Sequence, residues 1–244
     1  MQITPPLLPA VFETRYKRFF ADLRDADGNR LTVHCPNTGS MKNCLVPGSN
    51  CFYSLSNNPK RKLPGTLELV TTSKGQLAGV NTSRANHLVR EAIESGLIGE
   101  LQGYERMRSE VAYGIEKSRI DLLLEDSQRG QCYIEVKNVT LEEAEGRVMF
   151  PDAVTSRGTK HLRELMTILE QGHRAVLFFC VQVADAKSME IAAEIDPTYS
   201  QTLLRAMAMG LEVMAWRAKL SPEEIGLDSP IPFIQARQAP ELSG

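Results

Sequence analysis

The hydrophobic pattern of this chain changes at Asn81, and that change restricts the possible folds more than any other feature. Residues 10–80 hold short runs of strand-like alternation separated by turn signals, and no run with helical spacing interrupts them. From residue 82 to residue 94, apolar residues recur at the three- and four-residue spacing of an amphipathic helix. The 244-residue length suits one large domain or two small ones, so the change predicts two domains, residues 1–80 and residues 81–244.

The pattern of the first domain predicts a small β-barrel. Loose alternation over residues 15–23, a turn cluster at residues 25–29 and several later runs predict five short strands in about 70 residues. Short strands without helices close readily into barrels, and the OB-fold is the commonest barrel of this size. We therefore expect an N-terminal OB-fold.

The second domain mixes strands with helices, so the whole chain is expected to be an α+β protein. The run RAVLFFCVQV at residues 174–183 is almost continuously apolar, which is typical of a strand buried on both faces. Strand–helix crossovers in the second half predict a mixed sheet covered by helices. The tail at residues 221–244 is Pro-rich and weakly patterned. The expected helices are 82–94, 158–170 and 198–209, and the expected strands are 110–115, 119–124, 132–139, 174–183 and 211–218.

Composition narrows the class of protein. The chain is 42% hydrophobic and 24% charged, which is ordinary for a globular protein. It has no apolar run of the roughly 18 residues that a membrane helix needs, and its proline-broken start does not resemble a secretory signal. The five cysteines have irregular spacing and no C-x-x-C pair, which argues against a disulfide framework or a zinc site. We expect a cytoplasmic protein with reduced thiols and no membrane partner.

Charge is distributed unevenly along the chain. Residues 1–80 hold ten Lys and Arg against five Asp and Glu, a net charge of +5, whereas residues 81–244 hold eighteen against twenty-five, a net charge of −7. A basic half beside an acidic half suggests a nucleic-acid surface on the first. From charge alone, chance combined with a need for solubility explains the asymmetry about as well.

Basic residues of the first domain lie close to aromatic ones. OB-folds bind single strands by stacking bases on aromatic side chains within a basic groove, and the segment RYKRFF at residues 15–20 has that composition. A solvated strand with aromatic side chains in the core accounts for part of the same pattern. The predicted nucleic-acid contacts in this domain are Arg15, Lys17, Arg18, Lys60, Arg61 and Lys62.

The segment HCPNTGSM at residues 34–41 has the small polar residues of a loop. Backbone amides around Asn37, Thr38 and Gly39 could bind a phosphate or could form a domain interface. The sequence leaves both possibilities open.

The strongest chemical signal lies on two neighbouring strands. Asp121 stands alone among the leucines of one strand, and Glu135 and Lys137 share a face of the next, because side chains alternate along a strand. If the strands pair through the loop between them, the two carboxylates converge and supply the hard oxygen ligands that Mg²⁺ (or Mn²⁺) prefers. Lys137 could then orient or help deprotonate an attacking water, or stabilise charge on a phosphoryl group.

A plainer interpretation of Glu135 and Lys137 is a surface ion pair on a solvated sheet face. Such pairs are common, and Glu-x-Lys by itself favours this interpretation. The preceding strand aspartate and the following helix make a catalytic role about as strong.

The arrangement of an aspartate, Glu-x-Lys on the next strand and a following helix resembles the PD-(D/E)XK nuclease-like core. More specific strings make most of the chain, to about residue 235, resemble the bacterial sugar fermentation stimulation protein A family. The resemblance implies an N-terminal OB-fold, a C-terminal nuclease-like domain and DNA binding. The strings are RYKRF (15–19), HCPNTGSM (34–41), RKLPGTLEL (61–69), VNTSRAN (80–86), YIEVKNVTL (133–141) and FPDAVTSRGTKHLREL (150–165).

The resemblance also suggests further site residues. Glu91 on the helix at residues 82–94 resembles the helical acid that often completes the metal site, although a solvated helix glutamate explains it equally well. Independently of the resemblance, Arg157, Lys160 and His161 lie where the helix after Glu-x-Lys begins, and cationic side chains at a helix N-terminus could bind a phosphate. Lys160 and His161 could instead be ordinary surface residues, but their clustering with the motif favours a functional role. The pair at residues 151–152, Pro-Asp, follows Glu-x-Lys instead of preceding it, and a turn into the helix explains it better than the motif does.

These observations predict a DNA-binding protein that hydrolyses phosphodiesters. Asp121 and Glu135 would hold the metal and Lys137 would be the catalytic lysine. A non-cleaving DNA-binding regulator of sugar metabolism genes is the alternative, and an RNA-processing enzyme is a weaker one, so DNA is favoured over RNA. Intact residues do not prove activity, because fold does not fix function.

Overall fold

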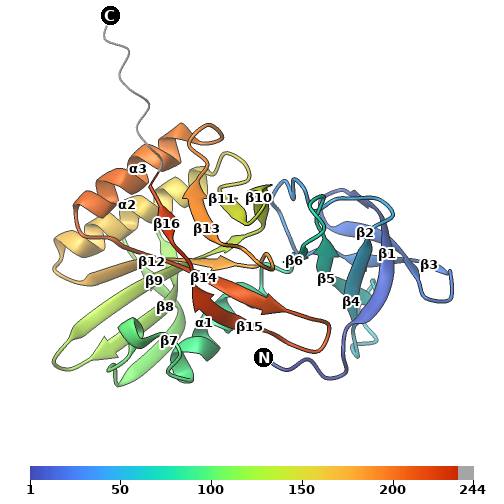
Figure 1. The fold of residues 1–244 in the computed structure, drawn as a ribbon. Coiled ribbons are helices and arrows are strands. Elements are labelled where there is room, and N and C mark those ends of the chain that lie inside the picture. Colours follow the sequence, from blue (N-terminus) through green and yellow to red (C-terminus); the bar gives the residue numbers. More distant parts are fainter. Residues whose placement is uncertain (236–244) are drawn as a thin grey trace, which may run out of the picture.

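Six strands form the N-terminal lobe of the structure, a computed structural model that describes residues 1–235 (Figure 1). Their order is β3-β2-β1-β4-β5-β6, and a parallel contact between β3 and β5 closes a five-stranded barrel, which confirms the expected OB-fold. The sixth strand extends the barrel beyond β5. The bounds are β1 (Leu8–Tyr16), β2 (Phe20–Asp25), β3 (Arg30–His34), β4 (Asn50–Leu55), β5 (Gly65–Thr71) and β6 (Leu77–Gly79).

The segment at residues 15–23 is a hairpin and not the single strand that its alternation predicts. Lys17 and Arg18 form the turn between β1 and β2, with left-handed φ angles of 47° and 63°. Tyr16 and Phe20 pair across the turn with stacked rings whose centroids lie 5.4 Å apart. The turn therefore places both cations at a hairpin tip and not along a strand.

The second lobe is built on a six-stranded mixed sheet of order β15-β14-β12-β9-β8-β7, as expected for an α+β protein. Its central strand β12 is buried over seven of its eight residues, which explains the continuous apolar run that encodes it. Parallel pairing joins β12 to β9 and β14, and the other pairs are antiparallel. The bounds are β7 (Arg106–Tyr113), β8 (Ser118–Asp126), β9 (Gly130–Val139), β12 (Arg174–Val181), β14 (Glu212–Leu220) and β15 (Ile225–Pro230).

Helices cover both faces of this sheet (Figure 1). On one face lies α1 (Arg84–Glu94), whose apolar stripe packs against Ile134, Val136 and neighbouring strands, while a short 3₁₀ turn (Gly99–Leu101) follows it. The other face is covered by α2 (Ser156–Glu170) and α3 (Pro197–Ala208), which also pack together. The Thr155 hydroxyl caps α2 by accepting a hydrogen bond from the Gly158 amide.

A second, four-stranded sheet was not predicted from the sequence. It has the order β10-β11-β13-β16 and bounds β10 (Leu141–Ala144), β11 (Arg147–Phe150), β13 (Ser188–Ile191) and β16 (Phe233–Ile234). These strands have two to four residues, too few for period-2 alternation to be recognised. Both β15 and β16 come from the tail expected to lack pattern, and residues 236–244 of that tail lie outside the described residues.

The chain start joins the two lobes. Gln2 bridges to Glu224, and the amides of Ile3 and Leu7 donate to carbonyls of residues 223 and 222, so the first seven residues run along the second lobe before β1 begins. Within residues 1–235, no helix combines the length and apolar character needed to cross a membrane.

Candidate active site at the junction of the two lobes

The two carboxylates of the predicted site lie on paired antiparallel strands. The register of β8 and β9 sets Leu122 opposite Ile134, so Asp121 and Glu135 occupy the next facing position. Both flanking neighbours of Asp121 are buried apolar residues, which fixes its side chain on the opposite face of the sheet. The pairing proposed from the sequence is therefore present.

Two hydrogen bonds hold the Asp121 carboxylate in place. One oxygen accepts a hydrogen bond from the Val136 amide at 2.7 Å, and the other accepts one from the Asn86 side chain at 2.8 Å. Burial raises the pKa of Asp121 to about 6, and the nearby charge of Glu135 adds to the rise, against the hydrogen bonds and the charge of Lys137. Two neighbouring carboxylates, both largely buried, repel each other, and a proton or a cation between them relieves that repulsion.

Glu135 is only 2% exposed and is held by two cationic or basic groups. Its Oε1 lies 2.6 Å from the Lys137 ammonium and also contacts the His161 ring. Burial alone would raise the pKa of Glu135, but Lys137 and His161 outweigh that effect, and the pKa is lowered. Its Oε2 is buried and has no hydrogen-bond partner among the described residues, which is a costly state unless a ligand completes it.

The N-terminal turns of α2 supply the remaining basic groups. His161 is buried, and its Nδ1 lies 3.5 Å from the Lys137 ammonium. The Nε of Arg157 donates to the other ring nitrogen of His161 at 3.4 Å, while Arg157 itself is exposed at the rim. Lys137, His161 and Arg157 thus form a line of basic groups from Glu135 to the surface.

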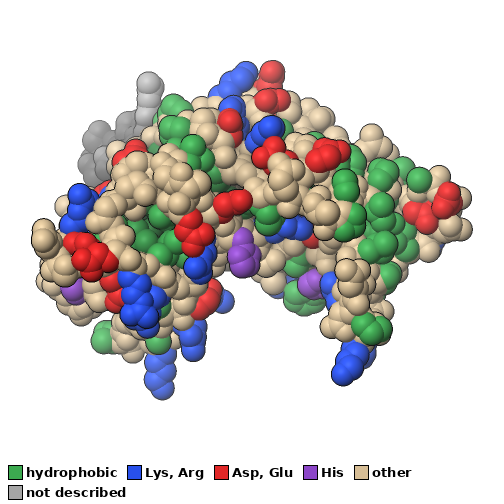
Figure 2. All heavy atoms as spheres, turned by 90° about the horizontal axis from the view of Figure 1, so that it is seen from below, with side chains coloured by type: hydrophobic (Ala, Val, Ile, Leu, Met, Phe, Trp, Pro, Cys, Tyr) green, Lys and Arg blue, Asp and Glu red, His purple; other side chains and the backbone are tan. Residues whose placement is uncertain are grey.

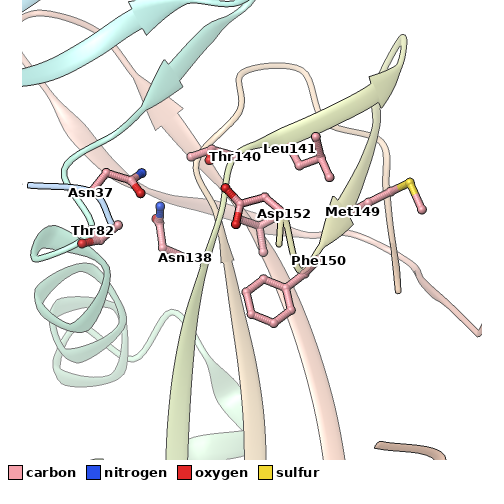
Figure 3. Close-up of a pocket in the computed structure, with 9 residues that line it drawn as sticks. Asn37, Thr82, Asn138, Thr140, Leu141, Met149, Phe150 and Asp152 are labelled. Carbon is pink, nitrogen blue, oxygen red and sulfur yellow. The ribbon is translucent and has the colours of Figure 1, made fainter. Parts of the chain in front are cut away.

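A cavity of about 460 Å³ opens above these residues, between the two lobes. Its walls include Asn37 and Thr38 from the loop after β3, Asn86 from α1, and the segment that joins β11 to α2. A smaller pocket of about 40 Å³ continues from it toward β10 and β11, and Figure 3 shows the Asn37 and Asn138 side chains approaching one another there. The candidate site therefore belongs to both lobes.

The loop of the barrel lobe is tied to the second lobe by Asp152. An Asp152 carboxylate oxygen accepts hydrogen bonds from the Met41 amide and the Ser40 hydroxyl, both at 3.1 Å. From the barrel side, Arg15 donates to the carbonyls of Asn37 at 2.5 Å and Gly39 at 3.2 Å. These contacts fix the loop as a wall of the cavity.

Comparison with known proteins assigns the family. Residues 83–224 match the family model described as the sugar fermentation stimulation protein RE domain, and residues 14–80 match the SfsA N-terminal OB domain. A sugar fermentation stimulation protein homolog from Teredinibacter turnerae is 56% identical over 96% of this chain and 100% of that protein. The chain belongs to the sugar fermentation stimulation protein family.

Other members of the family extend the comparison. A homolog from Shewanella baltica is 53% identical and covers 93% of this chain and 97% of its own length. The solved structure titled as Pyrococcus furiosus SfsA in complex with Ca²⁺ has a TM-score of 0.85 and 26% identity, covering 96% of this chain and 98% of that one. The fold found here is thus the SfsA fold.

Not every residue predicted for the site lies in this SfsA chain's cavity. The Glu91 carboxylate pairs with the N-terminal amine of Met1 at 2.9 Å, and its side chain is 51% exposed. It lies five residues after Asn86 on α1, so the helix directs the two side chains differently. Asn86, and not an acidic residue, is the α1 side chain that reaches Asp121.

Two predicted nucleic-acid contacts have internal roles. The Arg15 guanidinium holds the cavity loop, and the Lys160 ammonium donates to the Glu116 carbonyl at the turn between β7 and β8. Six other predicted cations are exposed: Lys17, Arg18, Lys60, Arg61, Lys62 and Arg157. Their role in nucleic-acid binding stays a prediction.

The residues present fit a hard divalent cation. Asp121 and Glu135 converge, and the Oε2 of Glu135 lacks a partner among the described residues. The pKa of Asp121 is raised first by burial and then by the charge of Glu135, and a bound cation would relieve both effects. Residues 1–235 contain no cluster of three or more His, Cys, Asp or Glu side chains with metal-site geometry, so Asp121 and Glu135 form a candidate site with only two side-chain ligands.

The sequence did not indicate three polar residues of the site: Asn86, Asn138 and Asp152. Asn138 follows Lys137 directly on β9, and its position at the end of a strand with catalytic signals was the available clue. The sequence predicts a turn at Asp152, because the Pro-Asp pair follows Glu-x-Lys. Its partners at residues 40 and 41 are more than a hundred positions away in the chain, so no local pattern indicates the contact.

Proposed function

We propose that this protein is a metal-dependent nuclease that hydrolyses phosphodiesters in DNA. The observation that carries the proposal is the pair of converging carboxylates, Asp121 and Glu135, with Lys137 2.6 Å from Glu135 in a cavity open to solvent. This combination of two acidic side chains and a lysine on paired strands resembles the PD-(D/E)XK arrangement and supports the proposal. An ordinary surface ion pair would be exposed, whereas Glu135 is 2% exposed.

The cation proposed is Mg²⁺ or Mn²⁺. The Ca²⁺ complex of the Pyrococcus furiosus relative supports a hard divalent ion in this family. Asp121 and Glu135 would hold it here, and when bound it would neutralise charge that develops on the phosphoryl group. The Oε2 of Glu135, which has no hydrogen-bond partner among the described residues, and one oxygen of Asp121 would be the atoms that bind the ion.

The chain's own basic groups would handle the substrate. The Lys137 ammonium can stabilise a phosphate oxygen or orient a water, since it lies beside Glu135 and is half-buried. Arg157 stands at the rim, where it can hold a neighbouring phosphate without being in the reacting centre. His161 keeps Lys137 and Glu135 in position through its contacts with both.

The molecular surface supports a polymeric anionic substrate. Figure 2 shows a hollow between the two lobes, with Lys and Arg side chains at the projecting tips on both sides of it and histidine at the hollow. Phosphate contacts from such rims would position a strand across the junction, where the carboxylates lie.

Incubation with DNA tests the proposal directly. Linear, nicked and single-stranded DNA would be incubated with the protein in Mg²⁺, in Mn²⁺ and in EDTA, with a parallel RNA series. We expect cleavage only with metal, and none from the Asp121→Asn, Glu135→Gln double variant. Cleavage that persists in this variant would place the active site elsewhere.

A non-cleaving DNA-binding regulator is the second candidate, favoured by one observation. Only two carboxylates are offered to the metal by the described residues, and one oxygen of Glu135 is already occupied by Lys137 and His161. DNA binding without cleavage of any substrate, in either metal, would support this function instead.

A further inference from the structure

The cavity beside the carboxylates has a wall of uncharged hydrogen-bonding side chains. Asn37 and Thr38 come from the barrel loop, Thr82 and Asn86 from the start of α1, and Asn138 from the end of β9. Neutral amides and hydroxyls are poor partners for a phosphate compared with Lys or Arg, but they match the polar edge of a nucleobase. The volume, about 460 Å³, lies within the range of roughly 300–1,000 Å³ typical of small-molecule pockets.

The side chains of Asn37 and Asn138 in this wall each have an NH2 group that donates no hydrogen bond within the described part of the chain. The Asn37 Oδ1 accepts the Gly39 amide at 2.8 Å, and the Asn138 Oδ1 accepts from the Gln182 side chain. Neither side-chain nitrogen donates a hydrogen bond to any of residues 1–235, although Asn37 is only 4% exposed. Figure 3 shows both amides turned toward the same space. Neither nitrogen is among the fully buried polar atoms that lack a partner, so both are open to the pocket, where a ligand acceptor could take the place of water.

The wall is rigidly held before any ligand arrives. Arg15 and Asp152 fix the barrel loop from its two sides, and the Thr82 hydroxyl donates to the Pro36 carbonyl at 2.8 Å. Gly39 lies so close to Asp152 that a Cβ there would be 2.6 Å from a carboxylate oxygen. Preorganised donors of this kind discriminate between ligands more sharply than flexible ones.

We propose that this pocket receives one unpaired nucleobase next to the phosphate at Asp121 and Glu135, with the Asn37 and Asn138 nitrogens donating to its carbonyl oxygens or ring nitrogens. In a duplex, pairing hides the Watson–Crick edge and stacking keeps the base out of a side pocket. The site thus selects single-stranded or locally melted nucleic acid. This inference rests on the proposed nucleic-acid function and names its substrate class.

The first test is binding in EDTA, where cleavage cannot interfere. A fluorescent single-stranded DNA oligonucleotide would be compared by anisotropy with its blunt duplex and with an abasic strand of the same length and charge. We expect the ordinary single strand to bind at least about 10-fold more tightly than the other two. Equal affinity for the abasic strand or the duplex would overturn the inference while leaving the nuclease proposal standing.

The second test uses Asn37→Asp, which keeps the oxygen that accepts the Gly39 amide and removes the donor nitrogen. We expect the preference for single strands over abasic strands to fall roughly 5- to 10-fold. Lys42→Gln, at an exposed lysine outside the wall, changes the net charge by the same amount without removing that donor, and it should weaken all three probes alike. An unchanged preference in Asn37→Asp would contradict the role assigned to this residue.

A third variant moves the wall without touching its polar groups. Gly39→Ala should displace the loop and lower the same preference, whereas Gly99→Ala, with open space around its Cβ position, should not. Thermal unfolding of each variant would confirm that it is folded. If the wild type binds no nucleic acid of any form, and cleaves none with Mg²⁺ or Mn²⁺, the proposed function fails and this inference fails with it.

Discussion

At the residue scale, Asp121 and Glu135 share one environment but differ in electrostatic state. The pKa of Asp121 is raised, because burial and the charge of Glu135 both oppose its ionisation. The pKa of Glu135 is lowered, because Lys137 and His161 outweigh the effect of burial. Divergent pKa values of neighbouring carboxyl groups are common in functional sites, although structural ion pairs produce them as well.

The metal-free protein should be stabilised by Asp121→Asn at neutral pH. Above pH 6 the carboxylate is ionised in both states, and its raised folded pKa, about 6 against an ordinary 3.8, disfavours the folded state. The substitution should raise the free energy of unfolding by up to about 3 kcal/mol at pH 7.5, and the gain should shrink as pH falls from 6 toward 4. Urea unfolding in EDTA at both ends of this range measures it.

Asp126→Asn is the matched control, because hydrogen bonds from the Arg129 and Gln128 amides lower the pKa of this exposed carboxyl. It should destabilise the protein, or leave it unchanged, over the same range. A gain from Asp121→Asn that is equal at pH 7.5 and pH 4.5 would contradict the assignment of its raised pKa.

Lys137→Met should lower the cleavage rate by at least about 100-fold while changing DNA affinity little. The substitution keeps much of the stem and removes the charge beside Glu135. Turnover and filter binding on one preparation would measure the two effects. Lys219→Met, at an exposed lysine paired with Glu224, should leave both unchanged. Wild-type turnover in Lys137→Met would reduce Lys137 to an ion-pair partner.

At the element scale, α2 connects the strands that carry Asp121 and Glu135 to the turn between β7 and β8. Buried Glu164 accepts hydrogen bonds from the Ile115 and Glu116 amides in that turn, and Arg163 pairs with the Glu116 carboxylate at 2.9 Å. His161, one turn earlier, contacts Glu135. The position of α2 therefore determines both the shape of the turn and the geometry of the site.

Gly114→Ala should destabilise the protein by about 2–4 kcal/mol, because the new Cβ would lie 1.7 Å from a Glu164 oxygen and φ is +70°. Gly130→Ala is the control: its φ is +77° with no atom within 4 Å, so only the backbone cost of about 1 kcal/mol applies. Chemical denaturation measures the difference. A similar decrease in the free energy of unfolding in both variants would show that Glu164 moves away from the new Cβ without destabilising the protein.

At the scale of the whole molecule, the two lobes are joined by buried polar contacts around the functional cavity. Glu68 on β5 is 3% exposed and accepts hydrogen bonds from Arg84 at 2.6 Å and from Asn81 at 2.8 Å. Thr72 donates to the fully buried Glu142 at 3.0 Å, which makes a second contact between the lobes. These contacts hold the basic barrel lobe against the lobe that carries Asp121 and Glu135.

Alanine at Lys60, Arg61 and Lys62 together should weaken DNA binding to a similar degree for all sequences. The three cations are exposed in the loop between β4 and β5, and phosphate contacts carry little sequence information. The slope of log affinity against log salt should become shallower, by up to about 0.9 for each duplex phosphate that the variant no longer neutralises. Weaker binding to one sequence alone, or an unchanged slope, would exclude this loop as a phosphate-binding surface.

The sequence determined the parts of this protein that depend on local rules. Hydrophobic periodicity identified the barrel lobe, the mixed sheet and all three α-helices, because a helix or strand must bury one face or both. Strand alternation and a short connecting loop sufficed to bring Asp121, Glu135 and Lys137 together. The short strands β10, β11, β13 and β16 were missed, because two to four residues carry no readable period.

The tertiary structure alone decided which residues complete the cavity and which do not. Asn37 and Asp152 meet there because the lobes pack together, and no local pattern encodes a contact between such distant segments. The rotation of α1 brought Asn86 and not Glu91 to Asp121, since packing against the sheet fixes which side of a helix faces a site. Arg15 and Lys160 are basic residues of the kind that bind nucleic acid. In the folded chain, however, both side chains donate hydrogen bonds to backbone carbonyls.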